Sequence, residues 1–356
     1  MSQAVVFIVP GDPDQRTGGY LFDARIVAEL RRMGWSIEVI GLDGRFPLAD
    51  ATARSSMASA LAGQSDQALI VIDGLALGAV PEVVAGQADR LRLVALIHHP
   101  LADETGLDPA TRERLLTRER MALDHCRQIL VTSRFTARRL QALALTRRAA
   151  VVIEPGVEPT DLAPAARACA EGRAEPGPQT LLCVASLTPR KGQDVLASAL
   201  GRLTDLPWLC RLSGSDQRDP AFAAALRRQI AQAGLGARIS IPGERDARQL
   251  EADYRWASAC VLASHYEGYG MVVSEALARG LPVIASTGGA LADTVPGDVG
   301  LKVAPGDVDA LAAALEAWLT QPSLRRRCFR AALARRGQLP AWPDSARRFA
   351  TALAAA

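Results

Sequence analysis

The chain has 356 residues, about the length of two ordinary domains. Hydrophobic residues make up 49% and charged residues 22% of the sequence, which excludes a disordered chain and predicts a large buried core. The formal net charge of +3 is too small to predict nucleic-acid binding, and the sequence shows no stacking platform or recognition motif. The six cysteines include no C-x-x-C pair, so we expect buried thiols in a reducing compartment.

No stretch of the sequence is apolar over the ~18 residues that a membrane-spanning helix needs. The N-terminus has no basic region followed by an apolar stretch, and it leads directly into Val5–Val9, which has the pattern of a buried strand. These features predict a cytoplasmic protein without an export signal.

The first half of the chain alternates apolar runs with amphipathic stretches. The apolar runs predict strands at Val5–Val9, Ser36–Ile40, Ala68–Ile72, Leu91–Ile97, Gln128–Val131 and Ala150–Ile153. Tyr20–Met33 has helical spacing, with Leu21, Ala24 and Val27 on its apolar side, and residues 110–125 have it too. Alternating strands and helices predict a parallel sheet with helices on both faces.

A segment rich in Pro, Ala and Gly follows at Glu154–Gln179, and we interpret it as the connection between two domains. The alternation then starts again. Strands are predicted at Thr180–Ala185, Trp208–Ser213, Arg238–Ile241, Cys260–Leu262, Pro282–Ala285 and Gly300–Val303, with helices between and after them. The chain ends in an amphipathic segment at Ser345–Ala355.

These elements predict an α/β fold of two Rossmann-like, doubly wound parallel-sheet domains in tandem, with a cleft between them. The first domain covers residues 1–154 and the second 180–339, with a linker at 155–179 and a terminal segment at 340–356. In such sheets, ligands bind beyond the C-terminal ends of the strands, next to helix N-termini. The loops after the strands are therefore where we expect chemistry.

The richest of these loops reads HYEGYGMVVSEALARG, at His265–Gly280. Gly268 and Gly270 precede the predicted helix, and they let a ligand approach the N–H groups at its positive end. Glu267 lies in the loop and Glu275 about one turn into the helix. A carboxylate there can accept two hydroxyl hydrogens, as from a ribose diol. Two surface glutamates around a tight turn are the alternative.

The first loop of the second half reads LTPRKG, at Leu187–Gly192. Adjacent Arg190 and Lys191 between a strand and a helix suit a phosphate group. Lys191 is one of two lysines in a chain with 41 Lys and Arg residues, so its position carries weight. A solvated helix start is the alternative, and a Walker A loop is absent.

The first strand leads into PGDPDQRTGGY, at Pro10–Tyr20. Gly18 and Gly19 directly precede the predicted helix and permit close backbone approach to an anion, although the loop does not spell G-x-G-x-x-G. Asp12 and Asp14 form a D-x-D pattern, which we interpret as a polar turn because no partner carboxylates accompany it.

Two of the four histidines, His98 and His99, stand at the end of a predicted strand. A neutral imidazole at this place can hydrogen-bond a sugar hydroxyl or a reacting oxygen. A capped strand end is the alternative. No third ligand has a suitable spacing, so we expect no metal site.

Together these four stretches resemble the retaining glycosyltransferases of family 4, which have the two-domain GT-B fold. The resemblance covers essentially the whole chain. Its most specific element is Glu267 followed by Glu275 with seven residues between them, as in the family's E-x7-E signature. VASLTPRKG at 184–192 is similar to the family's G-R-L-x-x-x-K-G, and SEALARGLPVIAS at 274–286 also reads like family sequence.

The resemblance implies roles for the matching positions in binding the donor. Glu275 would hold the ribose of the nucleotide, and Lys191 would neutralise the diphosphate. Gly18 and Gly19 would lie beside that diphosphate, and Glu267 would contact the donor sugar.

The resemblance also implies a reacting face and a returning helix. His98 or His99 would point toward the sugar, and backbone groups at Gly270, Met271 and Val272 would complete the donor site. Trp342 and the last helix would cross back onto the first domain.

The sequence departs from the family pattern at two places. Ser186 stands where the family has an arginine, and Arg190 is the candidate to replace that charge. The glutamate that often follows the family's Gly-Gly pair is missing, because Ala290 follows Gly288 and Gly289. Both departures concern the phosphate contacts.

The resemblance implies retaining transfer of a hexosyl group from a nucleotide sugar, most simply a UDP-sugar, to a hydroxyl acceptor. No metal or other cofactor is expected, because Lys191, Arg190 and helix N-termini can stabilise the charge on the leaving diphosphate. The alternatives are a nucleotide-sugar epimerase on the same scaffold and a non-catalytic sensor of sugar nucleotides, which Ser186 favours.

Residues 110–150 hold ten arginines against three acidic residues, a local net charge of +7. Basic amphipathic surfaces dock on anionic membranes, so peripheral attachment and a lipid acceptor such as diacylglycerol are one expectation. The residues assigned to the acceptor or membrane side are His99, Arg112, Arg114, Arg118 and Arg120. A solvated arginine face and a small soluble acceptor are the alternative.

Overall fold

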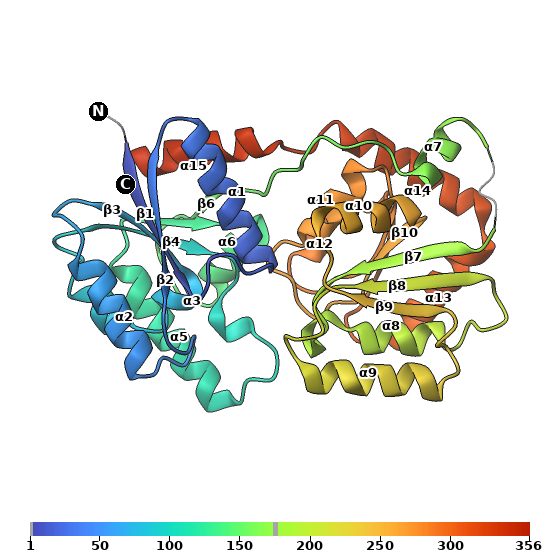
Figure 1. Cartoon of the computed structure of the whole chain (residues 1–356), viewed down its shortest axis with the longest axis horizontal. Helices are drawn as coiled ribbons and strands as arrows, with labels where there is room; N and C mark the ends of the chain where they lie inside the picture. The colour runs from blue at the N-terminus through green and yellow to red at the C-terminus, as the bar shows by residue number, and fades with distance from the viewer. Residues whose placement is uncertain (1–2, 174–176) are drawn as a thin grey trace. The chain divides into compact units, whose positions relative to one another are not determined.

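The computed structural model describes residues 3–173 and 177–356 and divides the chain into two compact units. Unit 1 comprises Met1–Gly156 and Pro340–Ala356, and unit 2 comprises Val157–Leu339. Each unit is built on one six-stranded sheet whose paired strands are parallel (Figure 1). The prediction of two doubly wound α/β domains is therefore confirmed.

Unit 1 contains the first six strands of the chain. They are β1 (Ala4–Pro10), β2 (Ser36–Leu42), β3 (Leu69–Asp73), β4 (Arg92–Ile97), β5 (Gln128–Val131) and β6 (Val151–Val152). All five residues of β3 are buried, because the central strands of a parallel sheet are covered on both faces. The strand order is β2-β1-β3-β4-β5-β6, so the direction of winding reverses between β1 and β3.

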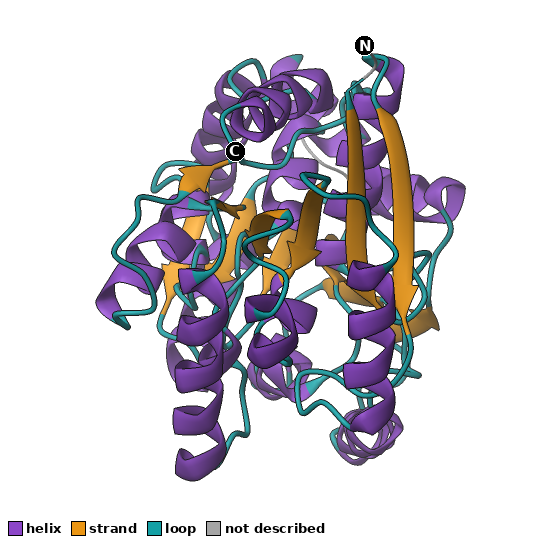
Figure 2. Cartoon of the chain, turned by 90° about the vertical axis from the view of Figure 1, so that its left-hand side faces the viewer, coloured by secondary structure: helices purple, strands orange, loops and turns teal. Residues whose placement is uncertain are grey.

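Helices of unit 1 cover both faces of this sheet (purple around orange in Figure 2). They are α1 (Gly18–Arg32), α2 (Ala51–Ala62), α3 (Gly74–Leu77), α4 (Pro81–Ala85), the 3-10 turn η1 (Leu101–Asp103), α5 (Pro109–Asp124), α6 (Arg134–Ala142) and α15 (Trp342–Ala354). Helix α15 returns from the end of the chain and packs on α1. Its Phe349 stacks on Phe7 with ring centroids 5.8 Å apart, and Trp342 lies 6.0 Å from Phe22. The predicted return of the terminal helix to the first domain is thus confirmed.

The apolar side predicted for the first helix is confirmed at Val27 and wrong at Leu21 and Ala24. Leu21 is 43% exposed and Ala24 is exposed, whereas the buried side of α1 carries Phe22, Ile26 and Leu30. Asp23 is buried on the same helix, and a buried carboxylate hides the true apolar face from a pattern of hydrophobic residues.

Unit 2 contains the other six strands. They are β7 (Gln179–Val184), β8 (Trp208–Ser213), β9 (Ile239–Gly243), β10 (Ala259–Leu262), β11 (Val283–Ser286) and β12 (Gly300–Val303). Their order is β12-β11-β10-β7-β8-β9, so the winding reverses between β7 and β10. In sheets of this kind the point of reversal is where ligands bind.

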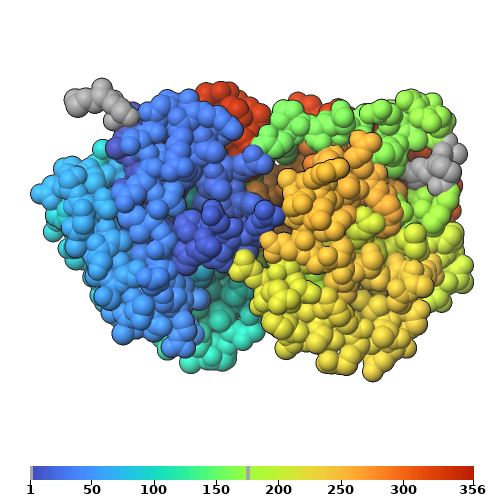
Figure 3. All heavy atoms as spheres, viewed as in Figure 1, coloured from blue at the N-terminus to red at the C-terminus, as the bar shows by residue number. Residues whose placement is uncertain are grey.

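The helices of unit 2 enclose its sheet in the same way. They are α7 (Pro164–Ala170), the 3-10 turn η2 (Pro189–Lys191), α8 (Gln193–Leu200), α9 (Pro220–Gln232), α10 (Ala247–Trp256), α11 (Met271–Ala278), α12 (Leu291–Thr294), α13 (Val308–Thr320) and α14 (Pro322–Arg336). Helix α9 forms part of the surface seen in Figure 3 (yellow), and it buries Ala223, Leu226 and Ile230 toward the sheet. This spacing of three and four residues is the helical period.

The segment predicted as a linker at 155–179 is part of unit 2 from Val157 onward. It contains α7, which packs on α14. Ala166 of α7 is fully buried, and a Cβ atom at Gly280 would lie 3.0 Å from its Cβ. The small side chains that made the segment resemble a linker are those that allow this close packing. Residues 174–176 of the predicted linker lie outside the described residues.

Five of the six cysteine thiols are buried and all six are free, as the sequence predicted; Cys169 is partly exposed. Among the described residues, no helix has the length and hydropathy to span a bilayer.

Candidate functional site

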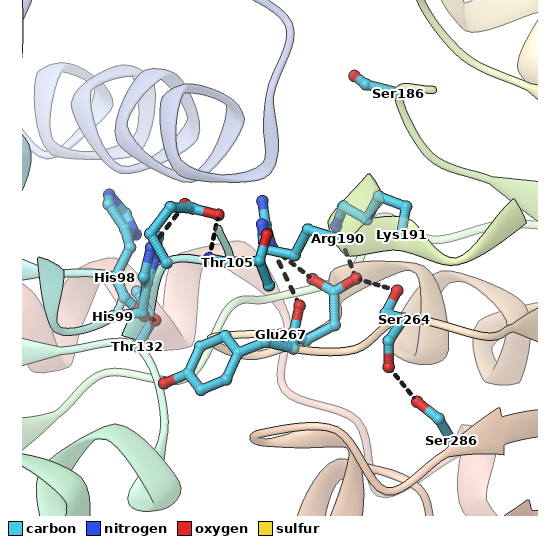
Figure 4. A network of polar contacts seen from close by, with 12 residues as sticks. His98, His99, Thr105, Thr132, Ser186, Arg190, Lys191, Ser264, Glu267 and Ser286 are labelled. Atoms are coloured by element: carbon cyan, nitrogen blue, oxygen red, sulfur yellow. Dashed lines mark hydrogen bonds and ion pairs between the residues drawn. The ribbon is translucent and has the colours of Figure 1, made fainter. Parts of the chain in front are cut away.

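The switch point of unit 2 gathers the charged residues that the sequence singled out. Lys191 follows β7 and Glu267 follows β10, and the Lys191 Nζ atom lies 2.6 Å from Glu267 Oε1 (Figure 4). The Ser264 hydroxyl donates to the same carboxylate oxygen at 2.7 Å, and Arg190 Nη1 lies 3.9 Å from Oε2. The sequence identified the two cations and the carboxylate but not their contact.

This cluster is largely withdrawn from solvent, with Glu267 10% and Lys191 18% exposed at their side chains. Burial by itself raises the pKa of the Glu267 carboxyl, but the charges of Lys191 and Arg190 outweigh burial and lower the pKa below its ordinary value. Glu267 is therefore ionised at neutral pH. Two cations and one carboxylate leave one excess positive charge at this end of the sheet.

Glycines let the loops of this site approach one another. A Cβ atom at Gly192, which has φ +63°, would lie 2.2 Å from the carbonyl oxygen of Ala263. A Cβ atom at Gly288 would lie 2.5 Å from the carbonyl oxygen of Ser264. Gly289 forms a parallel bridge with Glu267. The backbones of the loops after β7, β10 and β11 therefore come this close because these positions have no side chain.

Ser186, which stands where the family has an arginine, and its candidate replacement Arg190 lie at different distances from Glu267. The Ser186 side chain lies apart from the Glu267 carboxylate, whereas the Arg190 guanidinium lies beside it (Figure 4). Arg190 Nη1 also donates to the carbonyl oxygen of Tyr266 at 3.0 Å. An arginine is thus present at the site, although its contact with a phosphate group stays a prediction.

Helix α11 begins at this site without a side-chain cap. Its N-cap is Gly270, with φ +87°, which has no side chain to accept a hydrogen bond from the first N–H groups of the helix. Uncapped N–H groups at a helix start are available to an anion. One turn on, Glu275 Oε2 accepts a 2.5 Å hydrogen bond from the hydroxyl group of Tyr254.

Tyr254 is a site residue that the sequence analysis missed. It is fully buried, and Arg279 lies over its ring at 4.2 Å. Burial, with the Glu275 charge adding to it, raises the pKa of Tyr254 well above its ordinary value, so the hydroxyl keeps its proton and donates it. Tyr254 and Glu275 are 21 residues apart, and no sequence pattern links them.

Unit 1 gathers a second polar group at its own switch point. His98 Nε2 lies 3.2 Å from Asp23 Oδ1 and 3.5 Å from Asp73 Oδ2. Burial lowers the pKa of His98, but the two carboxylates outweigh burial and raise it. The sequence analysis missed both carboxylates, because they stand 75 and 25 residues before His98 on other elements.

His98 and His99 lie against different neighbours in unit 1. Gly19 lies against the ring, since a Cβ atom there would be 3.0 Å from His98 Cδ2. Gly18 and Gly19 form the first turn of α1 and do not precede it, a small correction to the predicted boundary. His99 Nε2 lies 3.5 Å from Glu104 Oε2.

Three of the four arginines assigned to an acceptor or membrane face contact other residues of unit 1. Arg112 Nε donates to the carbonyl oxygen of Ala102 at 3.1 Å. Arg118 pairs with Glu82 at 3.0 Å, and Arg120 Nε donates to a carbonyl oxygen at 2.8 Å. Arg114 is exposed. These contacts tie α5 to its neighbours, and membrane attachment stays a prediction.

Comparison with known proteins identifies the second half of the chain. Residues 169–335 match the family model described as glycosyl transferases group 1. The chain contains a glycosyl transferases group 1 domain. The family predicted from the motifs is thus confirmed at the level of group 1.

Curated relatives carry glycosyltransferase names. A glycogen synthase from Mycobacterium tuberculosis is 35% identical over 164 residues, 45% of this chain and 38% of that protein. The mannosyltransferase LpcC of Rhizobium leguminosarum is 33% identical over 155 residues, 42% of this chain and 43% of that protein. A D-inositol 3-phosphate glycosyltransferase from Mycobacterium sp. is 27% identical over 242 residues, 66% and 54% of the two chains. The chain therefore covers about half or less of the length of these relatives.

Solved structures share the whole fold. Sucrose-phosphate synthase from Thermosynechococcus elongatus has a TM-score of 0.80 at 23% identity over 98% of both chains. HepE from Anabaena, in complex with UDP-glucose, has a TM-score of 0.75 at 18% identity over 99% of this chain and 100% of that chain. These likenesses, with the two sheets described above, confirm the predicted GT-B fold.

Proposed function

We propose that this protein is a retaining, metal-independent glycosyltransferase that moves a hexosyl group from a nucleotide sugar to a hydroxyl acceptor. The observation that carries the proposal is the cluster of Lys191, Arg190 and Glu267 at the switch point of a group 1 domain. The proposed donor is a UDP-sugar, since the similar HepE of Anabaena forms complexes with UDP and with UDP-glucose.

In the proposed reaction, the bond between the sugar C1 and the diphosphate oxygen breaks and the acceptor oxygen bonds to C1. The proton of the acceptor hydroxyl leaves with the diphosphate. Charge grows on the diphosphate as the bond breaks, and donors that are already in place stabilise it. Lys191, Arg190 and the uncapped start of α11 supply these donors without a metal ion.

Glu267 and Glu275 have different surroundings and are proposed to have different roles. Glu267 accepts from Lys191 and Ser264, so a bound diphosphate would compete with it for the lysine. Glu275 accepts from Tyr254 at one oxygen, and its other oxygen is proposed to accept a ribose hydroxyl. His98 is proposed to face the sugar.

The acceptor is proposed to bind unit 1. A lipid such as diacylglycerol with peripheral attachment through residues 110–150, or a small soluble hydroxyl compound, would serve. Sedimentation with anionic liposomes at low and high salt separates the two. No binding at low salt removes the support for the membrane.

The test of the donor site is thermal stabilisation by a panel of nucleotides and nucleotide sugars, followed by release of nucleoside diphosphate. A donor at 100 times its Kd adds about 2.7 kcal/mol to the stability of the folded state. We expect one nucleotide sugar to raise the Tm and to release its diphosphate slowly without an acceptor. NMR of the product then shows whether the anomeric configuration is retained, and chelation by EDTA tests metal independence.

A matched pair of variants sharpens the test. Glu275→Ala should raise the donor KM or abolish turnover with the fold intact, whereas Glu316→Ala on the exposed side of α13 should change neither. No stabilisation by any nucleotide would reject the transferase and favour a sensor or scaffold that binds a different ligand.

A further inference from the structure

The loop after β4, residues 98–104, carries His98 and is held to α6 at both ends. At its start, the carbonyl oxygen of His98 accepts a hydrogen bond from the hydroxyl group of Thr136 at 3.3 Å. Near its end, Asp103 accepts two hydrogen bonds of 2.7 Å from the guanidinium group of Arg139. The two ends of the loop therefore have ordinary polar anchors on a single helix.

The middle of this loop is held by one buried carboxyl group on α5. Glu119 is fully buried, and its Oε2 atom accepts the N–H group of Leu101, the first residue of η1, at 3.0 Å. Its Oε1 atom is buried as well and has no hydrogen-bond partner among the described residues. The packing is close, since a Cβ atom at Gly78 would lie 3.4 Å from the Glu119 Cβ atom. Buried polar atoms normally have partners, so this oxygen needs an explanation.

The surroundings of Glu119 favour its neutral form. Burial and the charge of Asp103 on η1 raise the pKa of Glu119 to about 8, although the N–H group of Leu101 acts in the opposite direction. Helix α3, which also packs on α5, has no ionisable residue. The other charged side chains on and around α5 pair with one another: Asp103 with Arg139 and Arg112, and Glu82 with Arg118 and Arg54.

The two protonation states of Glu119 need different surroundings. With a proton on Oε1, the carboxyl group is uncharged, and Oε2 still accepts the N–H group of Leu101. Without that proton, a full charge is buried with one donor, and only water can supply further donors to Oε1. Water reaches Oε1 only if α5 and η1 move apart, because Glu119 has no exposed surface while they are packed together. Ionisation of Glu119 therefore favours release of the loop.

We propose that Glu119 is a positioning residue: while it keeps its proton it fixes the loop that carries His98, and when it loses that proton to solvent the loop is released. Glu119 acts through the backbone at Leu101, three residues after His98. Transfer should weaken as pH rises, because a released loop no longer holds His98 in place. This effect on activity rests on the proposed function, in which His98 faces the sugar, whereas the release of the loop does not.

The first test is hydrogen–deuterium exchange of the loop, which needs neither donor nor acceptor. Overlapping peptides that span 98–106 are followed at pH 6 and pH 8, and each rate is divided by the intrinsic exchange rate at that pH. Opening of the wild-type loop should increase at least about tenfold between the two pH values. The increase should reach about 50-fold if the released carboxyl group regains its ordinary pKa of 4.5 from about 8.

Three variants separate the roles of the acceptor atom and of the proton. Glu119→Gln keeps an oxygen that accepts the N–H group of Leu101 but cannot ionise, so the opening of its loop should not change with pH. Glu119→Ala removes the acceptor and should open the loop at both pH values. Glu113→Gln, on an exposed side chain of the same helix, is the matched control and should behave as the wild type.

The second test is the pH profile of diphosphate release with the donor found by thermal shift. In the wild type, kcat should fall about tenfold from pH 7 to pH 9, since about one molecule in ten keeps the proton at pH 9. The donor KM should change less than about twofold, because the donor is proposed to bind unit 2. Glu119→Gln should lose this pH dependence and keep the activity, whereas Glu119→Ala should be weak at every pH. A merely structural role would not give rescue by glutamine together with a flat profile.

Each contrary outcome is distinct. Loop exchange that depends on pH equally in the wild type and in Glu119→Gln overturns the proposal, whatever the activity. A loop that opens with pH while kcat stays constant overturns the positioning of His98. Absence of donor binding in the wild type rejects the proposed function, and the exchange measurement then still decides whether Glu119 holds the loop.

Discussion

Replacement of Lys191 by methionine tests the ion pair at the core of the proposed donor site. Lys191 Nζ lies 2.6 Å from a Glu267 oxygen, and the two side chains are 18% and 10% exposed. In a medium of effective dielectric constant 20, unit charges at this distance attract by about 6 kcal/mol, much of which offsets their desolvation. Removal of one partner from a buried pair costs about 3–5 kcal/mol, since the other charge stays buried. Arg190 at 3.9 Å and the Ser264 hydroxyl still contact the Glu267 carboxylate, so we expect the free energy of unfolding to fall by about 3 kcal/mol.

The loss should depend on pH in a defined direction. In the wild type the pKa of Glu267 is lowered, so its stabilisation is present above the ordinary glutamate range and is lost as pH falls through it. Without Lys191, burial is the dominant influence and raises the pKa of Glu267. The variant then gains stability by taking up a proton as pH falls. The difference in the free energy of unfolding between the wild type and Lys191→Met should therefore shrink by at least ~1 kcal/mol from pH 8 to pH 5. A change of less than one pKa unit at a single carboxyl group is enough to produce this.

The assay is urea unfolding at both pH values, followed by tryptophan fluorescence and paired with a donor assay. Activity should fall by about 10²–10³, the usual effect of removing one donor to a developing charge. The double variant Lys191→Met/Glu267→Gln should be more stable than Lys191→Met alone, because the neutral pair leaves no buried charge. An equal loss at pH 5 and pH 8, or a double variant no better than the single one, would refute this account of the pair.

Three other predictions follow from single side chains. Burial raises the pKa of Glu119 to about 8, so the free energy of unfolding of the wild type should fall as pH rises from about 5 to 8. Over that range, urea unfolding should show Glu119→Gln gaining roughly 4 kcal/mol of stability relative to the wild type. A difference between the two proteins that does not change with pH would contradict this. Gly192→Ala places a Cβ atom 2.2 Å from a carbonyl oxygen, so thermal unfolding should show a loss of stability well over ~2 kcal/mol. Gly234→Ala, at φ +69° with open space around it, should lose about 1 kcal/mol. Tyr254→Phe removes the donor to Glu275 and should weaken donor binding about tenfold by calorimetry while the fold survives; unchanged affinity would separate this pair from the ribose.

The strands could be predicted from the sequence because they lie in parallel sheets that helices cover on both faces. Gln128–Val131, Trp208–Ser213 and Gly300–Val303 have the predicted bounds, and the other predicted strands differ by one or two residues at their ends. A strand covered on both faces is a short run of apolar residues between polar loops, and this signal is local. The helix α7 within the expected linker was not predictable in the same way, since its alanines become informative only against α14.

The candidate sites show the same division between local and distant signals. Lys191 and Glu267 were identified from their own loops, yet their contact joins residues 76 positions apart. Asp23 and Asp73 were missed, because one lies in the middle of a helix and the other at a strand end without a motif around it. Motifs reveal the residues that lie within one strand–loop–helix unit. The residues that complete a site from other strands become visible only with the strand order.

The two switch points carry opposite charge. Two cations and one carboxylate meet after β7 and β10 in unit 2, and two carboxylates and one histidine meet around β3 and β4 in unit 1. A diphosphate would be attracted to the first group and repelled by the second. In an Arg-rich chain with two lysines, an excess of positive charge is the default. The two buried carboxylates around His98 depart from it, and burial raises the pKa of one of them, Asp73, to about 6.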